Sequence, residues 1–381
     1  MKDFTLKTID NTDILEELEN IGFDKSYSKI AQNKYKYLNI KIYDLTIPQA
    51  NILKQTALSW GSDCALHRDV LINNIDKTDC ILTGSISQLK KIAKSLEYQQ
   101  FSLNILSEKI EEIIIQQEKT TKTKLAGILN ITTNSFSDGG KYLEKEEATK
   151  HLLEMIKDGA DIIDIGAEST KPFSEPVDAK TQLERILPIL DFIKENNIKT
   201  LISIDTRSSE VAQKCIEKGA KIINDVSGFD YDEKMIEVIK NSDVKIILQH
   251  SQGTPENMQI NPKYDNVIDE IFKNLKDKVD YAISNGIDKS RIIIDVGIGF
   301  GKRREDNFEL IKRMSEFKAL GCEIMAGISR KSFLSLDDEL EKDIYTTALS
   351  TLLIEQKIDY LRVHNVKMHK KLLDLMENFG E

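Results

Sequence analysis

From about residue 124 to the C-terminus, short apolar runs alternate with longer segments of helical periodicity. The short runs are rich in Ile, Val and Leu, which is typical of strands that are buried on both faces. Each run is followed by a segment whose apolar residues recur at helical spacing. The runs predict eight strands: Leu125–Asn130, Asp161–Ala167, Thr200–Asp205, Lys221–Asp225, Val244–His250, Arg291–Asp295, Glu323–Ile328 and Tyr360–Val363.

Strands that alternate with helices predict right-handed βαβ units and a parallel sheet. Eight such units in about 250 residues are typical of a (β/α)8 TIM barrel. The alternative is an open doubly wound sheet, which usually has a Gly-rich first turn. No G-x-G-x-x-G sequence follows a strand here. We therefore predict an α/β protein whose second part is a TIM barrel.

The first 120 residues predict a small mixed α/β domain in front of the barrel. Its expected elements are helix Asp13–Ile21, strand Tyr35–Leu45, helix Pro48–Ser59, strand Asp79–Thr83 and helices Ser85–Leu96 and Ser102–Gln117. The polar, non-periodic stretch Glu118–Lys124 is expected to be a linker, so the predicted domains are 1–120 and 121–381. Cys64 and His67 share a face if their stretch is helical, but two ligands do not make a zinc site. We assign this domain no chemistry and an unknown role.

Composition narrows the class of protein. The chain has 381 residues, 40% hydrophobic and 30% charged, which is typical of a soluble globular protein. It has no apolar run long enough to span a membrane, and its acidic N-terminus does not resemble a signal peptide. The four scattered cysteines indicate reduced thiols in a cytoplasmic protein. A net charge of −10 argues against nucleic-acid binding.

Polar side chains stand at the carboxyl ends of the predicted strands. In a parallel barrel these ends surround one mouth, where barrel enzymes carry their active sites. A single polar residue here would usually be a satisfied core group, but a whole set is better explained by a functional site. The set comprises Asn130, Glu168, Ser169, Thr170, Asp205, Asn224, Asp225, His250, Asp295, Ser329, Arg330, Lys331, Arg362 and His364.

The set divides into two kinds of chemistry. Asp205, Asn224 and Asp295 offer acceptors and an amide, which suit a flat heterocycle rich in N–H donors, such as an aminopyrimidinone. The other group, Lys331, Arg362 and His364, is cationic or nearly so and suits phosphate or pyrophosphate. We therefore expect a pocket with one wall for a donor-rich ring and one for an anion.

Two other motifs suggest different chemistry. The sequence DVGIGFGK, from Asp295 to Lys302, is similar to a P-loop. It has one residue too few between its glycines, and Arg303 replaces the required Ser or Thr. Lys331 is an alternative Schiff-base lysine of the kind found in barrel aldolases. Its neighbours Ser329, Arg330 and Ser332 suit anion binding better.

The stretch LAGILNITTNSFSDGG, from Leu125 to Gly140, resembles the first strand and loop of dihydropteroate synthases, in the pterin-binding family. Six further motifs follow in the family's order, between about Lys124 and Leu375, and together they make the resemblance specific. They are DIGAESTKP (164–172), SIDT (203–206), IND (223–225), DVGIGFGK (295–302), GISRKSF (327–333) and RVHNV (362–366).

The resemblance implies an enzyme of folate biosynthesis. It would join 6-hydroxymethyl-7,8-dihydropterin diphosphate to p-aminobenzoate and release pyrophosphate. Carried over by position, the pterin-binding residues would be Asp205, Asn224, Asp295 and Lys331. The pyrophosphate would contact Asn130, Arg362 and His364, with Asn130 also near a Mg²⁺ ion. The p-aminobenzoate site would comprise Phe136, Thr170, Pro172, Phe300, Lys331 and Ser332, and Gly327 would also contact substrate. Asp205, Lys331, Arg362 and His364 would serve catalysis.

The resemblance also implies a mechanism and an assembly. Pyrophosphate would leave first, the dihydropterin ring would delocalise the resulting cation, and the aromatic amine would then attack. Family members often form dimers through helices at the far end of the barrel, so a homodimer is expected.

The chain departs from the family pattern at several positions. Thr133 and Asn134 replace Pro-Asp in the first loop, and Lys171 replaces an Arg in the second. Gln249 replaces a Met, and Val296 replaces a Pro after Asp295. We expect these departures to affect the details of the loops, the dependence on magnesium and the turnover rate. Two alternatives stay open. One is a methyltetrahydrofolate-binding methyltransferase domain that serves a corrinoid protein, which would share the ring pocket. The other is a non-catalytic pterin-binding paralogue, which Asn134 and Lys171 favour.

Overall fold

The computed structural model describes residues 4–9, 14–119, 121–131, 140–168, 176–253 and 257–379. It divides the chain into two compact units, Met1–Lys119 and Thr120–Glu381. Each unit has a hydrophobic core of its own.

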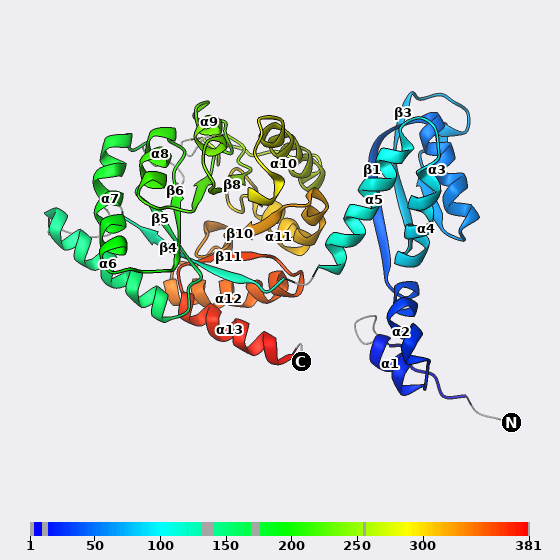
Figure 1. Ribbon diagram of the computed structural model, residues 1–381, viewed down its shortest axis with the longest axis horizontal. Coiled ribbons are helices and arrows are strands. Elements are labelled where there is room, and N and C mark those ends of the chain that lie inside the picture. The colour runs from blue at the N-terminus through cyan, green and yellow to red at the C-terminus, as the bar shows by residue number, and fades with distance from the viewer. Residues whose placement is uncertain are drawn as a thin grey trace. The chain divides into compact units, whose positions relative to one another are not determined.

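The second unit is a closed barrel of eight parallel strands, which confirms the predicted TIM barrel (Figure 1). The strands neighbour each other in the order β10-β11-β4-β5-β6-β7-β8-β9. Their bounds are β4 Lys124–Asn130, β5 Ile162–Gly166, β6 Leu201–Asp205, β7 Ile222–Asp225, β8 Lys245–Gln249, β9 Ile292–Asp295, β10 Glu323–Ala326 and β11 Tyr360–Val363.

Helices surround the strands because each helix has one apolar face to bury (Figure 1). Their bounds are α6 Gly140–Lys157, α7 Ala179–Glu195, α8 Ser209–Glu217, α9 Met235–Lys240, α10 Val267–Ser284, α11 Arg304–Lys312, α12 Glu339–Glu355 and α13 Val366–Phe379. Several begin at side-chain caps, as when Asp178 accepts a hydrogen bond from the backbone N–H of Thr181. Such a cap stabilises a helix by about 1 kcal/mol.

Two sets of apolar side chains hold the barrel together. Strand residues such as Ile163, Ile204 and Ile246 pack against the helices in the main core. A separate cluster takes one residue from each of seven strands and fills the barrel interior: Ala126, Ile162, Ile222, Ile247, Ile293, Met325 and Tyr360. The barrel is therefore closed by packing.

The first unit is an α/β layer with a three-stranded antiparallel sheet in the order β1-β3-β2. Its elements are α1 Ile14–Asn20, α2 Lys25–Ala31, β1 Tyr37–Thr46, α3 Ile47–Ser59, β2 Asp63–Leu66, β3 Lys77–Ser85, α4 Ile86–Leu96 and α5 Leu103–Glu118. This confirms a small α/β unit in front of the barrel. The stretch of Cys64, however, is strand β2 and not a helix. Cys64 is buried between exposed Asp63 and Ala65, a period of two in place of the helical period.

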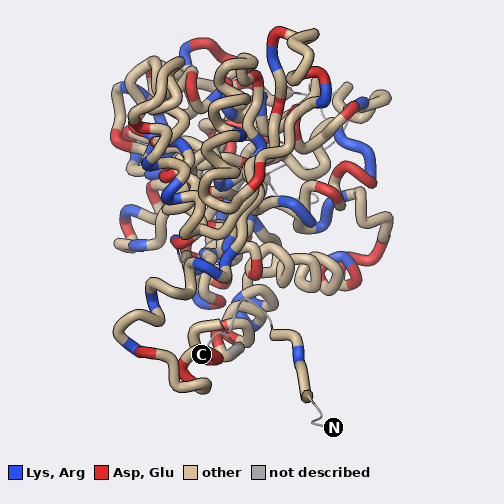
Figure 2. The backbone as a smooth tube through the Cα atoms, turned by 90° about the vertical axis from the view of Figure 1, so that its right-hand side faces the viewer, with Lys and Arg blue, Asp and Glu red and all other residues tan. Residues whose placement is uncertain are grey.

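Charges of both signs are interspersed along the backbone, as Figure 2 shows for the coloured part of the chain. Among the described helices, none has the length and apolar character needed to cross a membrane.

Candidate active site at the barrel mouth

At the carboxyl ends of four neighbouring strands, β4 to β7, three polar residues and one glycine lie side by side in register. Asn130 pairs in register with Gly166, Gly166 with Asp205, and Asp205 with Asn224. A Cβ atom at Gly166 would lie 3.4 Å from both the Asn130 Oδ1 and the Asp205 Cβ atoms. Glycine at this position therefore leaves space between the Asn130 and Asp205 side chains at the mouth.

Arg362 joins two buried carboxylates across the mouth. Its Nε donates to Asp164 Oδ2 and its Nη2 to Asp205 Oδ2, each at 2.6 Å. Asn224 also donates to Asp164 Oδ2, at 3.2 Å. The other oxygen of Asp164 is buried and has no hydrogen-bond partner among the described residues. The mouth thus holds acceptor capacity beyond what the described side chains use.

Asp164 is a site residue that the strand-end pattern missed. It lies in the middle of β5, and its side chain is 0% exposed. The available signal was a lone charged residue inside the apolar run IIDIG, since buried carboxylates need partners.

Asp295 lies at the end of β9, on the other side of Arg362. Its Oδ1 accepts a hydrogen bond from the backbone N–H of Gly297, at 2.7 Å. A Cβ atom at Gly327 would lie 3.8 Å from carbon atoms of Arg362 and 3.9 Å from Asp295 Oδ2. Gly327 therefore leaves space beside both charged groups.

Burial and neighbouring charges shift the pKa values of these groups. Burial raises the pKa of Asp205 to about 7. The Arg362 guanidinium acts in the opposite direction, and the Asp164 carboxylate raises the pKa further. Burial also raises the pKa of Asp295, although Gly297 N–H and Lys331 act in the opposite direction. Lys331 has a pKa lowered to about 8 by burial and by Arg362. Carboxyl and amine groups with displaced pKa values in one cleft are typical of an active site.

His364 differs from the expected near-cationic group. Its ring Nδ1 lies 3.0 Å from Ser329 Oγ, and its backbone N–H donates to the same hydroxyl at 3.1 Å. Burial, Arg330 and Arg362 lower the pKa of His364 to about 3. The imidazole is therefore neutral near pH 7 and acts as a hydrogen-bonding group.

Several strand-end residues from the predicted set serve the scaffold. Arg330 forms two hydrogen bonds with Asp343, at 2.8 and 2.9 Å. Asp225 accepts hydrogen bonds from the backbone N–H groups of Ser227 and Phe229 and so caps the loop after β7. Gln249 and Val296, two departures from the family pattern, are buried in the barrel.

Lys331 and Phe300 lie on another side of the mouth, and Ser332 begins the turn that follows Lys331. The Lys331 Nζ lies 4.0 Å from the centroid of the Phe300 ring, within range of a cation–π contact. His250 contacts Lys302 at 3.0 Å, and burial lowers the pKa of His250 to about 2. The ring nitrogen of His250 therefore already has a hydrogen-bonding partner, the buried Lys302.

The remaining predicted residues lie outside the described residues. They are Phe136, Ser169, Thr170 and Pro172, together with the departures Thr133, Asn134 and Lys171.

The described residues suit a magnesium ion only as part of a substrate complex. No group of three His, Cys, Asp or Glu side chains that could hold a metal is present in the described ranges. Mg²⁺ usually keeps several waters and binds through one or two protein oxygens plus substrate phosphates. The exposed amide of Asn130, at the end of β4, offers one such oxygen.

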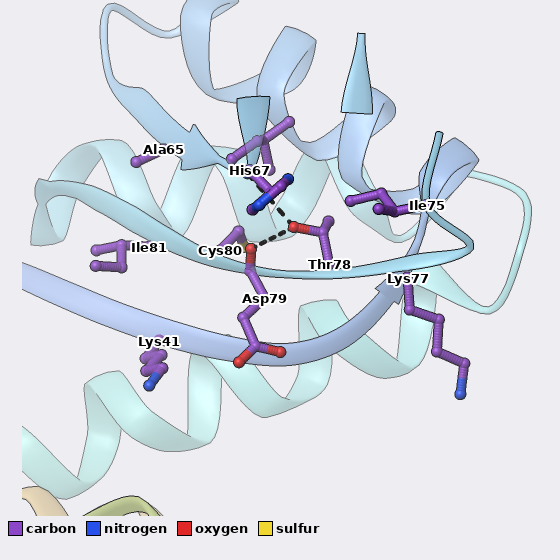
Figure 3. A pocket seen from close by; sticks show the side chains of 10 residues that line it. Lys41, Ala65, His67, Ile75, Lys77, Thr78, Asp79, Cys80 and Ile81 are labelled. Carbon is purple, nitrogen blue, oxygen red and sulfur yellow. Dashed lines mark hydrogen bonds between the residues drawn. The ribbon is translucent and has the colours of Figure 1, made fainter. Parts of the chain in front are cut away.

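The first unit has a separate open cavity of about 570 Å³ beside β3 (Figure 3). Lys41 and Asp79 lie on one side of this strand, and His67 and Thr78 on the other. The Thr78 hydroxyl accepts a hydrogen bond from the backbone N–H of His67 at 3.4 Å and donates to the Asp79 carbonyl at 2.7 Å. The polar groups of this cavity are spread around a strand, unlike the convergent set at the barrel mouth.

Comparison with known proteins places these observations in context. Residues 126–364 match the family model described as "Pterin binding enzyme". A bifunctional dihydropteroate synthase/dihydropteroate reductase of Helicobacter pylori is 31% identical over 381 residues, covering 97% of this chain and 98% of that protein. A solved dihydropteroate synthase of Anaplasma phagocytophilum, with bound 6-hydroxymethylpterin-monophosphate, is 37% identical. The match covers 68% of this chain and 100% of that one, with a TM-score of 0.63.

A third relative is much longer than this chain. It is a probable bifunctional folylpolyglutamate synthase/dihydropteroate synthase of Halobacterium salinarum, 35% identical over 329 residues. The match covers 84% of this chain but only 40% of that protein.

Proposed function

The chain belongs to the family of pterin-binding enzymes, and we propose that it is a dihydropteroate synthase of folate biosynthesis. As a transferase it would join 6-hydroxymethyl-7,8-dihydropterin diphosphate to p-aminobenzoate and release pyrophosphate. The observation that carries the proposal is the buried wall of Asp164, Asp205 and Asp295, with Arg362 at its centre.

This wall suits the dihydropterin ring because the ring is flat and rich in N–H donors. Buried carboxylates are costly unless donors face them. Asp205, Asn224 and Asp295 would accept from and donate to the ring edge, and Lys331 would contact it from the Phe300 side. The free oxygen of Asp164 adds acceptor capacity at the same depth.

In the reaction, the bond between the methylene carbon and the diphosphate oxygen breaks as negative charge grows on the leaving group. Arg362, whose Nε and Nη2 donate to Asp164 and Asp205, offers its remaining N–H groups to that charge, and the neutral His364 offers a hydrogen bond. Asp205 and Asp295 favour the cation that the ring delocalises, most strongly where water is excluded. The uncharged amine of p-aminobenzoate, bound between Phe300 and Ser332, then attacks the methylene carbon and loses a proton.

Magnesium fits this scheme as a partner of the diphosphate. Asn130 would supply a protein ligand, and the substrate phosphates and water would supply the rest. When bound, the ion would help to neutralise charge on the leaving group.

A homodimer and a cytoplasmic location belong to the same proposal. Leu340, Ile344 and Leu352 are exposed along α12, an apolar stripe that suits contact with a second copy. The four cysteines are free and buried, in keeping with a reducing compartment.

Product analysis tests the proposal. Incubation with both substrates should yield 7,8-dihydropteroate, identified by its mass. Two rival functions predict other results. A methyltetrahydrofolate-binding methyltransferase domain would bind a pterin without forming this product, and a non-catalytic paralogue would bind the pterin diphosphate and leave it intact.

The full-length match to the Helicobacter pylori protein favours a second activity, dihydropteroate reduction, that depends on the first unit. The family model leaves this unit out, whereas the bifunctional relative aligns across it. In such a step a reduced nicotinamide nucleotide would transfer hydride to ring carbon 6, and a proton would add to N5. Loss of NADPH absorbance on addition of dihydropteroate would support this activity, and unchanged absorbance would refute it for this donor.

A further inference from the structure

One buried carboxylate oxygen joins the two walls of the barrel mouth. Asp164 Oδ2 accepts a hydrogen bond from Arg362 Nε at 2.6 Å and another from Asn224 Nδ2 at 3.2 Å. The strands of these donors, β11 and β7, each lie two strands away from β5, in opposite directions around the barrel. Asn224 belongs to the wall assigned to the ring and Arg362 to the wall assigned to the anion. A single atom of Asp164 therefore fixes a residue of each wall.

Asp164 lies one layer deeper in the barrel than the residues at the mouth. Along β5, Ile162 belongs to the apolar cluster that fills the barrel interior, and Gly166 is in register with Asp205 at the mouth. Asp164 stands midway between Ile162 and Gly166, and the alternation of a strand turns all three toward the interior. Its side chain is 0% exposed, compared with 15% for Arg362. Asp164 is therefore placed to act through the residues above it.

Arg362 is held at two points, which leaves part of its guanidinium available. Its Nε donates to Asp164 and its Nη2 to Asp205, so two different carboxylates fix the guanidinium plane. Within the described ranges, the Nη1 group donates to no protein acceptor. These N–H groups meet a phosphate oxygen with good geometry only while the guanidinium keeps its orientation. Asp164 supplies one of the two anchors for that orientation.

A second cluster of Asp, Arg and Asn, in the scaffold, has a different geometry. Arg330 donates to both oxygens of Asp343, at 2.8 and 2.9 Å, and Asn365 donates to Oδ2 at 3.0 Å. Both oxygens are satisfied, and the arginine forms a fork on one carboxylate. Asp164 instead receives both donors on Oδ2, and its Oδ1 has no partner among the described residues. The Asp343 cluster therefore closes on itself, whereas the Asp164 cluster connects two groups that face the mouth.

We propose that Asp164 is a positioning residue that couples recognition of the pterin ring to binding of the diphosphate. A ring that orients the Asn224 amide also steadies the shared oxygen, and with it Arg362. An anion on Arg362 acts on Asn224 by the same route, because coupling between two sites is reciprocal and groups of one hydrogen-bond network are coupled. The inference rests on the proposed function, since dihydropterin diphosphate carries both parts in one molecule.

Calorimetry with the two parts as separate ligands tests the coupling. The probes are 6-hydroxymethylpterin and inorganic pyrophosphate, added to the full chain at one fixed Mg²⁺ concentration. The coupling factor is the Kd of pyrophosphate alone divided by its Kd at saturating 6-hydroxymethylpterin. We expect a factor of about 5 or more in the wild type. Asp164→Asn should reduce it about twofold or more, because hydrogen bonds to a neutral acceptor are about half as strong as those to a carboxylate.

Two further variants complete the experiment. Asp343→Asn is the matched control, because it neutralises the same kind of cluster in the scaffold. It should lower stability and leave the coupling factor at the wild-type value. Asn224→Ala keeps Asp164 and Arg362 but removes the link between the two walls, so it should nearly abolish the coupling. This variant decides the question if Asp164→Asn does not fold.

Two results would overturn the inference. One is a wild type that binds both ligands without coupling. The other is an Asp164→Asn variant that binds both ligands more weakly but keeps the wild-type factor, as expected of a purely structural residue. The proposed synthase is tested separately, by formation of dihydropteroate from both substrates. A chain that shows the coupling but forms no dihydropteroate would refute the proposed function and leave the role of Asp164 in place.

Discussion

Asp295 is the carboxylate whose contribution is easiest to isolate at the scale of single residues. It accepts the backbone N–H of Gly297 and has no ion-pair partner among the described residues, so asparagine can keep its shape and that bond. Asp295→Asn should weaken binding of a pterin analogue about 5- to 150-fold, since a mismatched buried hydrogen bond costs about 1–3 kcal/mol. Asp205→Asn should have a similar effect. Calorimetric affinities equal to that of the wild type in both variants would refute the assignment.

Arg362 tests the anion side of the mouth. Arg362→Lys keeps the charge but replaces a fork by a point charge, and it weakens the links to Asp164 and Asp205. We expect kcat to fall about 10-fold or more, because the lost interaction grows in the transition state. The KM for p-aminobenzoate should change little. If that KM rises strongly and kcat is spared, Arg362 binds the benzoate carboxylate instead.

The pKa values at the mouth predict a pH dependence of pterin binding. Burial raises the pKa of Asp205 to about 7, so below that pH the carboxyl is protonated and loses acceptor capacity. Affinity should therefore rise between pH 5.5 and 7.5, with an apparent pKa that belongs to the coupled group. Since His364 has a pKa lowered to about 3, His364→Gln should keep this rise, and Asp205→Asn should lose it. The opposite pattern would assign the titration to His364.

The strand-end rule predicted much of the site residue by residue, because the ends of parallel strands must meet at one mouth. Asn130, Asp205, Asn224, Asp295 and Arg362 lie there. The rule could not reveal that Arg362 pairs with Asp164, which is 198 positions away and inside a strand. It also could not distinguish Arg330, whose partner Asp343 lies on α12, from a free anion-binding group.

At the scale of elements, the barrel strands were predictable because each is a short, continuous apolar run. Strand β2 was not. It is an edge strand, paired only with β3 in a three-stranded sheet, and only Cys64 in it is buried. So short an alternation cannot be told from one turn of an amphipathic helix.

The loop after β9 gives an element-scale prediction. Gly297 has a φ of +67°, and a Cβ atom there would lie 1.9 Å from the carbonyl oxygen of His250. Gly286 has a φ of +93°, and a Cβ atom there would have no neighbouring heavy atom within 4 Å. Gly286→Ala should cost about 1 kcal/mol through backbone conformation alone. Gly297→Ala should reduce the free energy of unfolding by more than about 2 kcal/mol, because backbone must also move.

Denaturant unfolding of both glycine variants measures this difference. Equal losses of stability would show that the loop relaxes freely and that the close contact with His250 does not constrain Asp295.

At the scale of the whole molecule, we expect synthesis to depend on the second unit alone and reduction to require the first unit. The set of residues assigned to synthesis lies wholly within Thr120–Glu381. A chain that begins at Thr121 should therefore keep dihydropteroate synthesis and lose any NADPH-dependent reduction. A folded truncation without synthase activity, as judged by circular dichroism, would mean that the first unit completes the site or its dimer.

The central claim is that the barrel mouth joins two substrates and releases pyrophosphate. Its most direct test is the initial rate of pyrophosphate release from the full chain, with each substrate omitted in turn. The account predicts release only when dihydropterin diphosphate and p-aminobenzoate are both present, with one dihydropteroate formed for each pyrophosphate. Absence of release under these conditions, in a chain that still binds the pterin diphosphate, would contradict it.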